Sequence, residues 1–176
     1  MPAGPTYAPL YTSTATETVA SFVFSGIVQT YNDLVVSCSL RGTQAATTVD
    51  LLLRVNGSSS NIYDGNRFSG TGTSQVTGRY TNASFAAPMG AMVAANAAAN
   101  VFSAHEINFF RYSDTAMFKS VVARGASNYD TSANGYVDLV LNNYFSTAAV
   151  STITLLPSAG SFAAGSVVTI YGIAAA

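Results

Sequence analysis

Few residues in this chain have side chains that could carry out chemistry at a metal or thiol centre. Among 176 residues there is one histidine, His105, and one cysteine, Cys38. A structural zinc site needs about four nitrogen, sulfur or oxygen ligands, usually including pairs of Cys or His at short spacings. Glu106 follows His105, but no second histidine lies four residues on, so the helical zinc-protease motif is absent. In a strand the two side chains point to opposite faces, and we expect His105 at the surface or at an interface. We therefore expect no metal and no cofactor.

Signals for nucleophilic catalysis and for glycoside hydrolysis are equally weak. No Gly-x-Ser-x-Gly elbow occurs, and a catalytic triad would have to use His105. Paired carboxylates could cleave a glycosidic bond, but most acidic residues lie at predicted turns or on polar strand faces, and the chain has no tryptophan to stack on a sugar. No pair stands out, so we predict no catalytic residue and no enzyme. The carboxylates considered are Asp50, Asp64, Glu106, Asp114, Asp130 and Asp138.

Period-two alternation of apolar and polar residues dominates the chain after residue 16. Such alternation is typical of half-buried strands, and it places Cys38 on the apolar face of its strand as a small buried side chain. It also predicts four phenylalanines in the core, namely Phe22, Phe24, Phe109 and Phe118. Residues that tolerate positive φ predict turns at Asn56–Asn61 and Asp64–Asn66. Residues 89–100 break the pattern and could form either a short helix or a packed loop of small residues. The predicted strands are Thr18–Val28, Asp33–Arg41, Thr47–Val55, Gln75–Ala87, Val101–Phe110, Ala116–Arg124, Gly135–Phe145, Val150–Leu156 and Val167–Ile173. Strands separated by turns, with hardly any helix, predict an all-β sandwich or barrel.

The composition predicts a chain that binds other chains. Only 9% of the residues are charged and 49% are hydrophobic, whereas soluble domains average about 25% charged residues. A surface so poor in charge is typically covered by another protein. The net charge of −1 provides no basic stripe for phosphates, so we expect no nucleic-acid partner. No apolar run approaches the roughly 18 residues of a membrane span, and we expect no membrane partner.

Residues 1–16 form a predicted N-terminal docking arm, and residues 17–176 a single β-sandwich domain. Three prolines interrupt regular structure in the first nine residues, and apolar side chains follow at intervals. A free tail is normally polar, so this segment is suited to a groove on a partner chain. The alternative is a disordered start that touches nothing. The predicted partner-binding residues are Tyr7, Pro9, Leu10 and Tyr11.

Two stretches of the sequence have a distinctive pattern. The first is IVQTYNDLVV at 27–36 with LLRVNG at 52–57, and the second is VSTITLL at 150–156, GSF at 160–162 and AGSVVTIYGI at 164–173. This arrangement resembles a widespread group of small structural proteins of tailed bacteriophages. Their chains end in a similar G-S-x-x-T-L-Y-G-I strand that follows a similar I-T-S-I-T-L strand. Here Ile170 replaces the usual leucine, and three alanines follow Ile173.

The resemblance implies a virion component with a jelly-roll-like antiparallel β-sandwich, commonly a homotrimer, with no catalytic residues to transfer. We expect a capsid decoration (cement) protein on the outer surface of the capsid, which binds and stabilises the shell of the major capsid protein. The absence of coiled-coil or shaft repeats favours this role over a stand-alone tail fibre. The alternative is a receptor-binding module of a tail fibre or baseplate, whose loops Asn56–Asn66 or Asn128–Gly135 contact a host surface glycan.

Overall fold

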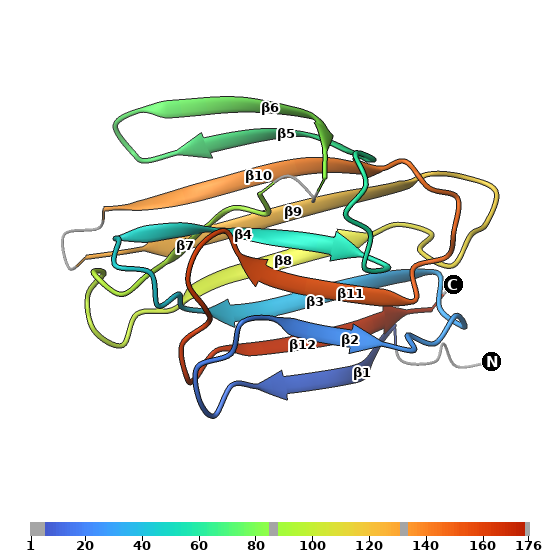
Figure 1. Cartoon of the computed structure of the whole chain (residues 1–176), viewed down its shortest axis with the longest axis horizontal. Helices are drawn as coiled ribbons and strands as arrows, with labels where there is room; N and C mark the ends of the chain where they lie inside the picture. Colours follow the sequence, from blue (N-terminus) through green and yellow to red (C-terminus); the bar gives the residue numbers. More distant parts are fainter. Residues whose placement is uncertain (1–5, 85–87, 131–133, 175–176) are drawn as a thin grey trace.

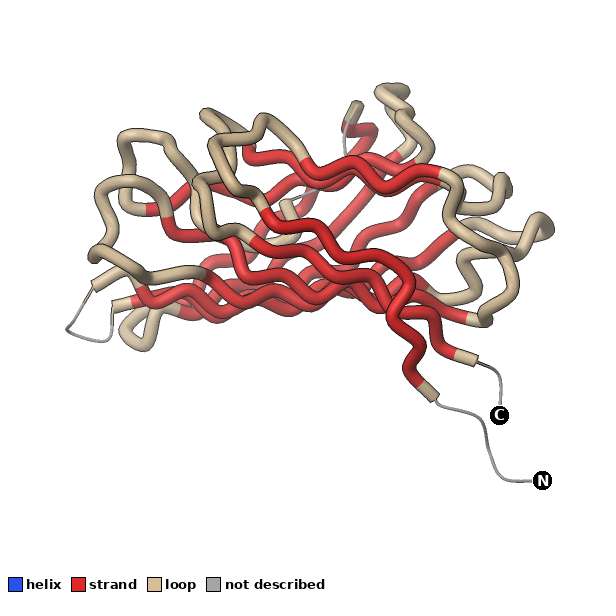
Figure 2. The backbone as a smooth tube through the Cα atoms, turned by 90° about the horizontal axis from the view of Figure 1, so that it is seen from below, coloured by secondary structure: helices blue, strands red, loops and turns tan. Residues whose placement is uncertain are grey.

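A computed structural model describes residues 6–84, 88–130 and 134–174. Three parts of the predicted elements lie outside these residues, namely 1–5 of the arm, 85–87 of the strand Gln75–Ala87, and 131–133 of the loop Asn128–Gly135. All regular structure in the described ranges is β-strand (Figure 2). Within the same ranges, no helix is long and apolar enough to cross a membrane.

Two antiparallel sheets pack face to face as two layers (Figures 1 and 2). The larger sheet has the order β1-β12-β3-β8-β9-β10-β5-β6, and the smaller has the order β2-β11-β4-β7. The predicted all-β, jelly-roll-like antiparallel β-sandwich is thereby confirmed. The strands are β1 (Tyr7–Thr14), β2 (Phe22–Ser25), β3 (Asp33–Leu40), β4 (Thr48–Val55), β5 (Tyr63–Gly70), β6 (Gln75–Ala83), β7 (Ala91–Val93), β8 (Ser103–Phe109), β9 (Lys119–Asn128), β10 (Gly135–Tyr144), β11 (Thr152–Pro157) and β12 (Val167–Ile173).

The main core lies between the small sheet and the middle of the large sheet. Alternate residues of β3 and β4 face each other there, as their period-two pattern predicts. Cys38 is buried among them, and burial raises the pKa of its thiol, so it behaves as a small hydrophobic side chain. The prediction that Phe118 lies in the core is wrong, because Phe118 is 56% exposed. Its ring packs edge-on against Phe145, with the ring centroids 5.5 Å apart.

The described part of the predicted N-terminal arm is a strand of the sandwich. β1 pairs antiparallel with β12 along its whole length, and Ala15 is buried, with its amide bonded to the Ser166 carbonyl at 2.8 Å. The predicted domain boundary at residue 16 therefore falls inside the fold. Pro9 is tolerated because β1 is an edge strand and its register shifts between Pro9 and Tyr11.

Besides β1, two strands were not predicted, and both border the candidate site described below. β5 lies where the sequence indicated a turn at Asp64–Asn66, because its polar residues hide the alternation. β7 lies in the alanine-rich segment 89–100, the rest of which is loop. The Arg41 guanidinium holds that loop, because it donates to the carbonyls of Ala98 and Val101 at 2.8 and 2.9 Å. The turn predicted at Asn56–Gly57 is confirmed by the positive φ angles of both residues, 52° and 67°.

Candidate functional site

The half of the large sheet formed by β10 and β5 differs from the rest in what its two faces carry. In β3 and β8 the inner face is buried and mostly apolar, as at Ile107, while the outer face is mostly polar, as at Ser37 and Glu106. β10 also buries apolar side chains such as Val140 on its inner face, but Asp138 points inward beside them and Leu139 points outward. A β-strand that places charge inside and leucine outside is unusual for a sandwich. Both faces of this half are therefore candidates for binding.

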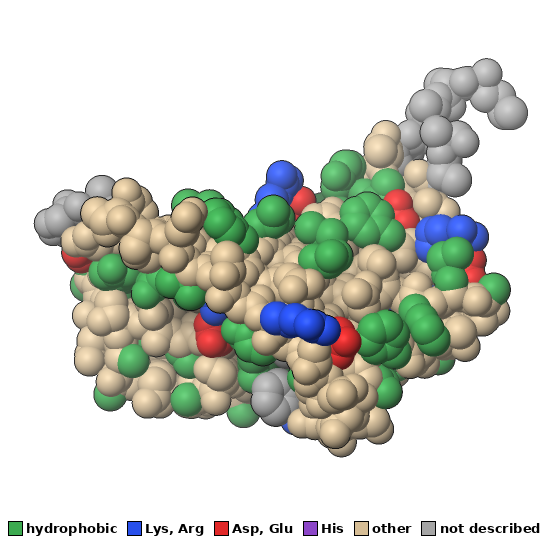
Figure 3. Space-filling model, turned by 90° about the horizontal axis from the view of Figure 1, so that it is seen from above, with side chains coloured by type: hydrophobic (Ala, Val, Ile, Leu, Met, Phe, Trp, Pro, Cys, Tyr) green, Lys and Arg blue, Asp and Glu red, His purple; other side chains and the backbone are tan. Residues whose placement is uncertain are grey.

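The outer face of β10 and β5 carries an exposed apolar patch, which we call the outer strip. Its exposed fractions are 68% for Val137, 56% for Leu139, 43% for Leu141 and 48% for Phe68. Leu139 and Phe68 are direct cross-strand neighbours, and a hollow of about 350 Å³ lies beside them. The side chains seen from above in Figure 3 are likewise mostly neutral or hydrophobic, with few charges. A patch of this kind is typical of a surface that contacts another protein.

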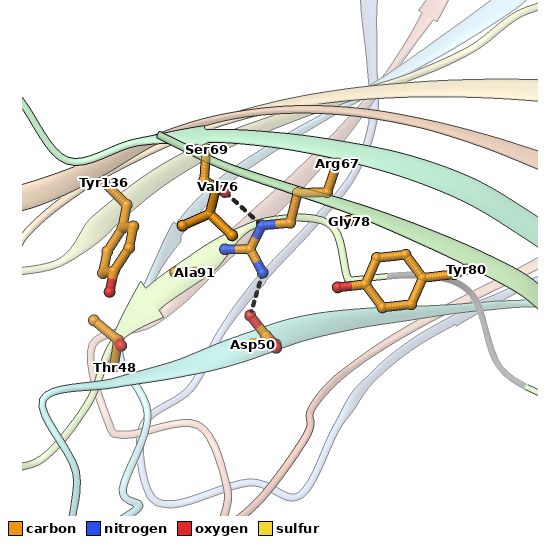
Figure 4. Close-up of a pocket in the computed structure, with 9 residues that line it drawn as sticks. All are labelled: Thr48, Asp50, Arg67, Ser69, Val76, Gly78, Tyr80, Ala91 and Tyr136. Carbon is orange, nitrogen blue, oxygen red and sulfur yellow. Dashed lines mark hydrogen bonds and ion pairs between the residues drawn. The ribbon is translucent and has the colours of Figure 1, made fainter. Parts of the chain in front are cut away.

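The inner face of the same strands borders a polar cavity of about 250 Å³, which we call the cleft (Figure 4). The cleft lies between β5 and β6 of the large sheet and β4 and β7 of the small sheet, and one residue of β10 completes it. Beyond β7 the small sheet has no further strand among the described residues, so the overhanging β5–β6 hairpin leaves a gap. The lining residues are Thr48, Asp50, Arg67, Ser69, Val76, Gly78, Tyr80, Ala91 and Tyr136.

An ion-pair network forms the base of the cleft. Arg67 bonds through Nη1 to Oδ1 of Asp50 at 2.7 Å and through Nε to Oδ1 of Asp138 at 2.9 Å. Asp138 is fully buried and also accepts hydrogen bonds from the Ser69 hydroxyl and from the Ala91 amide, the latter at 2.8 Å. Burial alone would lower the pKa of Arg67, but the two carboxylates outweigh it and raise that pKa. The guanidinium is therefore charged and held in place.

His105 lies behind this network, at the inner side of the large sheet. We expected it at the surface or at an interface, and that prediction is wrong, because His105 is only 3% exposed. Burial outweighs the opposing influence of Asp138 and the Met89 backbone and lowers the pKa of His105 to about 4. Its ring has room because the residue opposite is Gly125, where an added Cβ would lie 2.6 Å from His105 Nδ1.

Ser69, Asp138 and His105 come close together without forming a catalytic triad. In a triad the histidine bonds both the nucleophile and the carboxylate. Here Ser69 bonds Asp138 directly, and neither ring nitrogen of His105 has a hydrogen-bond partner among the described residues. In the described ranges no group of three His, Cys, Asp or Glu side chains could hold a metal ion. The arrangement is suited to holding Arg67 rigid, and the absence of enzyme activity stays a prediction.

The four predicted partner-binding residues all lie on β1 but differ in exposure. Tyr7 is 56% exposed and Pro9 is also exposed. Leu10 and Tyr11 pack against the core, and the Tyr11 hydroxyl donates to the Gly26 carbonyl at 3.0 Å. Half of the predicted set is thus engaged within the chain, and contact of these residues with a partner stays a prediction.

Neither the outer strip nor the cleft was predicted from the sequence. A signal for the strip was present in Gly135–Phe145, where Val137, Leu139 and Leu141 alternate with Asp138 and other residues. Carboxylates are seldom buried, so the alternation alone would place the face with Leu139 in the core and the face with Asp138 at the surface. The cleft has no comparable signal, because its residues come from five strands that are distant in sequence.

Comparisons with known proteins give little beyond the fold. No known protein family and no curated protein matches the sequence. Among solved structures, galectin LEC-6 from Caenorhabditis elegans aligns over 93% of this chain and 96% of its own, with 11% identity and a TM-score of 0.33. At that level the likeness carries no argument about function, so the site must be interpreted from its own geometry.

Proposed function

We propose that this chain is a non-enzymatic structural protein that docks on another protein through the outer strip. The observation that carries the proposal is that β10 exposes Val137, Leu139 and Leu141 on the outer face of the sheet while it buries Asp138 on the inner face. Leu139 is 56% exposed, so covering the rest of it contributes about 1–1.5 kcal/mol to association, roughly half the value for full burial and before the entropic cost of binding. Three such residues and Phe68 on adjacent strands make a compact centre for an interface.

The proposed partner is a protein with a neutral, partly apolar surface. On the outer face, Arg124 lies opposite Leu139 and already pairs with Glu106 at 2.8 Å. Arg79 of β6 is exposed and lies opposite Asn66, beside the strip. A surface that is neutral apart from an acidic group near Arg79 would therefore complement this face, and a strongly basic surface would not. The sequence resemblance specifies the proposal further: a decoration protein on the outer surface of a tailed-phage capsid, bound to the major capsid protein and assembled as a homotrimer.

Counting copies tests the specific role. In particles of the phage that encodes the chain, quantitative mass spectrometry would give its amount relative to the major capsid protein. A decoration protein is expected at hundreds of copies per particle, on the order of one per few shell subunits. A few tens of copies would move the chain to the tail and favour the receptor-binding alternative, and absence from the particle would refute the virion assignment.

A surface substitution tests the docking mechanism. Leu139→Glu places a charge in the outer strip and should abolish attachment to undecorated shells in a co-sedimentation assay. Ser39→Glu is the matched control, because it adds the same charge to the exposed polar half of the same sheet face. If Leu139→Glu still decorates shells as fully as Ser39→Glu, the outer strip is not the docking surface. Deletion of residues 2–12 is a poorer test, because it removes most of β1.

A further inference from the structure

We propose that the cleft is a binding site for one neutral sugar residue, such as the terminal pyranose of a glycan. This site is separate from the outer strip, since Arg67 and Ser69 face the cleft while Phe68 between them faces the opposite side of the sheet. It is also distinct from the loops Asn56–Asn66 and Asn128–Gly135. The proposal does not depend on the proposed docking function.

The polar groups of the cleft leave one donor and one acceptor free at its base. Two guanidinium nitrogens of Arg67 are occupied by carboxylates, whereas Nη2 has no partner among the described residues and is not sealed from solvent. Asp50 uses Oδ1 for the ion pair, and its side chain is 38% exposed. A carboxylate oxygen beside a guanidinium N–H can bind two adjacent hydroxyl groups, one as acceptor and one as donor.

Aromatic rings border the cleft on two sides. In Figure 4, Tyr136 of β10 and Tyr80 of β6 lie on opposite sides of the Arg67 guanidinium. Each ring offers an apolar face and a hydroxyl group, which suits a molecule with both C–H and O–H surfaces. Between them the walls are kept open by the small residues Gly78 and Ala91. A cavity of about 250 Å³ has room for a single small ring rather than an extended ligand.

The charge of the cleft favours a neutral ligand. Asp50 and Asp138 contribute two negative charges and Arg67 one positive charge, so the network has a net charge of −1. An acidic sugar or a phosphate would meet this negative balance, with both carboxylates near the only cation. A cationic ligand would have to approach Asp50 beside the Arg67 charge that already neutralises it. A neutral polyol carries no charge that the cleft would have to compensate, and its hydroxyl groups match the free donor and acceptor.

The binding test uses the full chain and defined small probes. Methyl glycosides of glucose, galactose and mannose are titrated to about 50 mM while the ¹H–¹⁵N spectrum is recorded. For a single pyranose we expect a dissociation constant of a few millimolar with at least one of them. The backbone signals of Tyr80 and Tyr136 should shift, while those of Ser37 and Ser39 on the distant strand β3 should not. No saturable shift with any of the three glycosides would overturn the proposal.

Variants identify the groups responsible. Tyr136→Ala should weaken binding about tenfold or more, and Asp50→Asn, which keeps the side-chain shape, should do the same if Tyr136→Ala does not fold. Tyr7→Ala removes an exposed tyrosine outside the cleft and should leave affinity unchanged.

Equal affinity in wild type, Tyr136→Ala and Asp50→Asn would overturn the site. Tighter binding of glucuronate or n-butylammonium than of the neutral glycosides would overturn the ligand class. Leu139→Glu should still bind the glycoside, which separates this result from a failure of docking.

Discussion

The two halves of the eight-stranded sheet differ in what they bury and what they expose. In β3 and β8, inward side chains such as Val36 and Ile107 are fully buried and apolar, and the outer face is mostly polar. In β10 and β5, the inward side chains include Asp138 and Ser69, and the outer face carries leucine and phenylalanine. The first half is covered by the small sheet, whose apolar strands it must match. The second half extends past β7, and only part of it, such as Val140, reaches the apolar core.

This difference shows how the sandwich combines stability with binding surfaces. In the half under the small sheet, apolar side chains of the two sheets are buried against each other, and this burial stabilises the fold. The overhanging half keeps a buried ion only because Arg67, Ser69 and the Ala91 amide satisfy Asp138. Apolar groups that cannot be buried there face outward and remain available to a partner. The exposed apolar side chains of β10 and β5 therefore form the surface that we propose contacts a partner.

The largest expected effect comes from breaking the buried ion pair. Asp138→Ala leaves Arg67 partly unpaired and removes the acceptor for Ser69 and the Ala91 amide, so we expect a loss of about 4 kcal/mol in the free energy of unfolding. Urea titration followed by far-UV circular dichroism would measure it. Glu106→Ala is the matched control, because it removes a carboxylate paired with Arg124 on the exposed face. Its effect should be a small fraction of that of Asp138→Ala.

Equal losses for Asp138→Ala and Glu106→Ala would contradict the distinction between the two faces. A small loss for both would mean that water enters the cleft and hydrates the network around Asp138. A large loss for both would mean that the Glu106–Arg124 pair is buried in an assembly of the purified chain. Sedimentation velocity on the same samples separates these two results.

The next effect compares apolar side chains on opposite faces of the two halves. Ile107→Ala removes a fully buried side chain and should cost about 3 kcal/mol. Leu139→Ala removes a side chain that is 56% exposed and should change the free energy of unfolding by less than about 0.5 kcal/mol in the monomer. The same urea titration measures both. If Leu139→Ala costs as much as Ile107→Ala, the outer strip is already covered in solution, which would identify a second copy of this chain as its partner.

Where an apolar layer covers the sheet, the sequence was sufficient to predict the fold. The alternation in β3 and β4 predicted both the strands and their buried faces, and β12 was predicted with its bounds as observed. β1 was taken for an arm because Pro9 and small residues obscure its pattern. Its pairing with β12 depends on residues more than 150 positions away, which no local pattern can reveal.

The candidate site lies where the local rules give the wrong answer. In β5 the residues Asp64, Gly65 and Asn66 are typical of a turn, yet pairing with β10 and β6 makes them a strand. His105 was expected at the surface or at an interface because it alternates with Glu106 along a predicted strand. Its burial depends on Gly125 opposite and on the neighbouring network, and both are set by cross-strand register rather than by sequence spacing.

The smallest expected effect is a pH dependence that arises from His105. Because its pKa falls from 6.5 in the unfolded chain to about 4 in the fold, the unfolded state binds an extra proton between those values. Stability is therefore complete above pH 6.5 and is lost as the pH falls, by about 2 kcal/mol between pH 7 and pH 5. The pKa values of Glu106 and Asp114 are lowered from 4.5 and 3.8, so these carboxylates contribute their loss of stability mainly below that window.

Urea titrations at the two pH values, on wild type and His105→Leu, measure the effect. His105→Leu should remove the difference between pH 7 and pH 5, since leucine does not titrate. A variant that keeps the full acid loss would show that other groups cause it and that the pKa of His105 is not lowered in the folded chain, as expected if water reaches its ring on the inner side of β8.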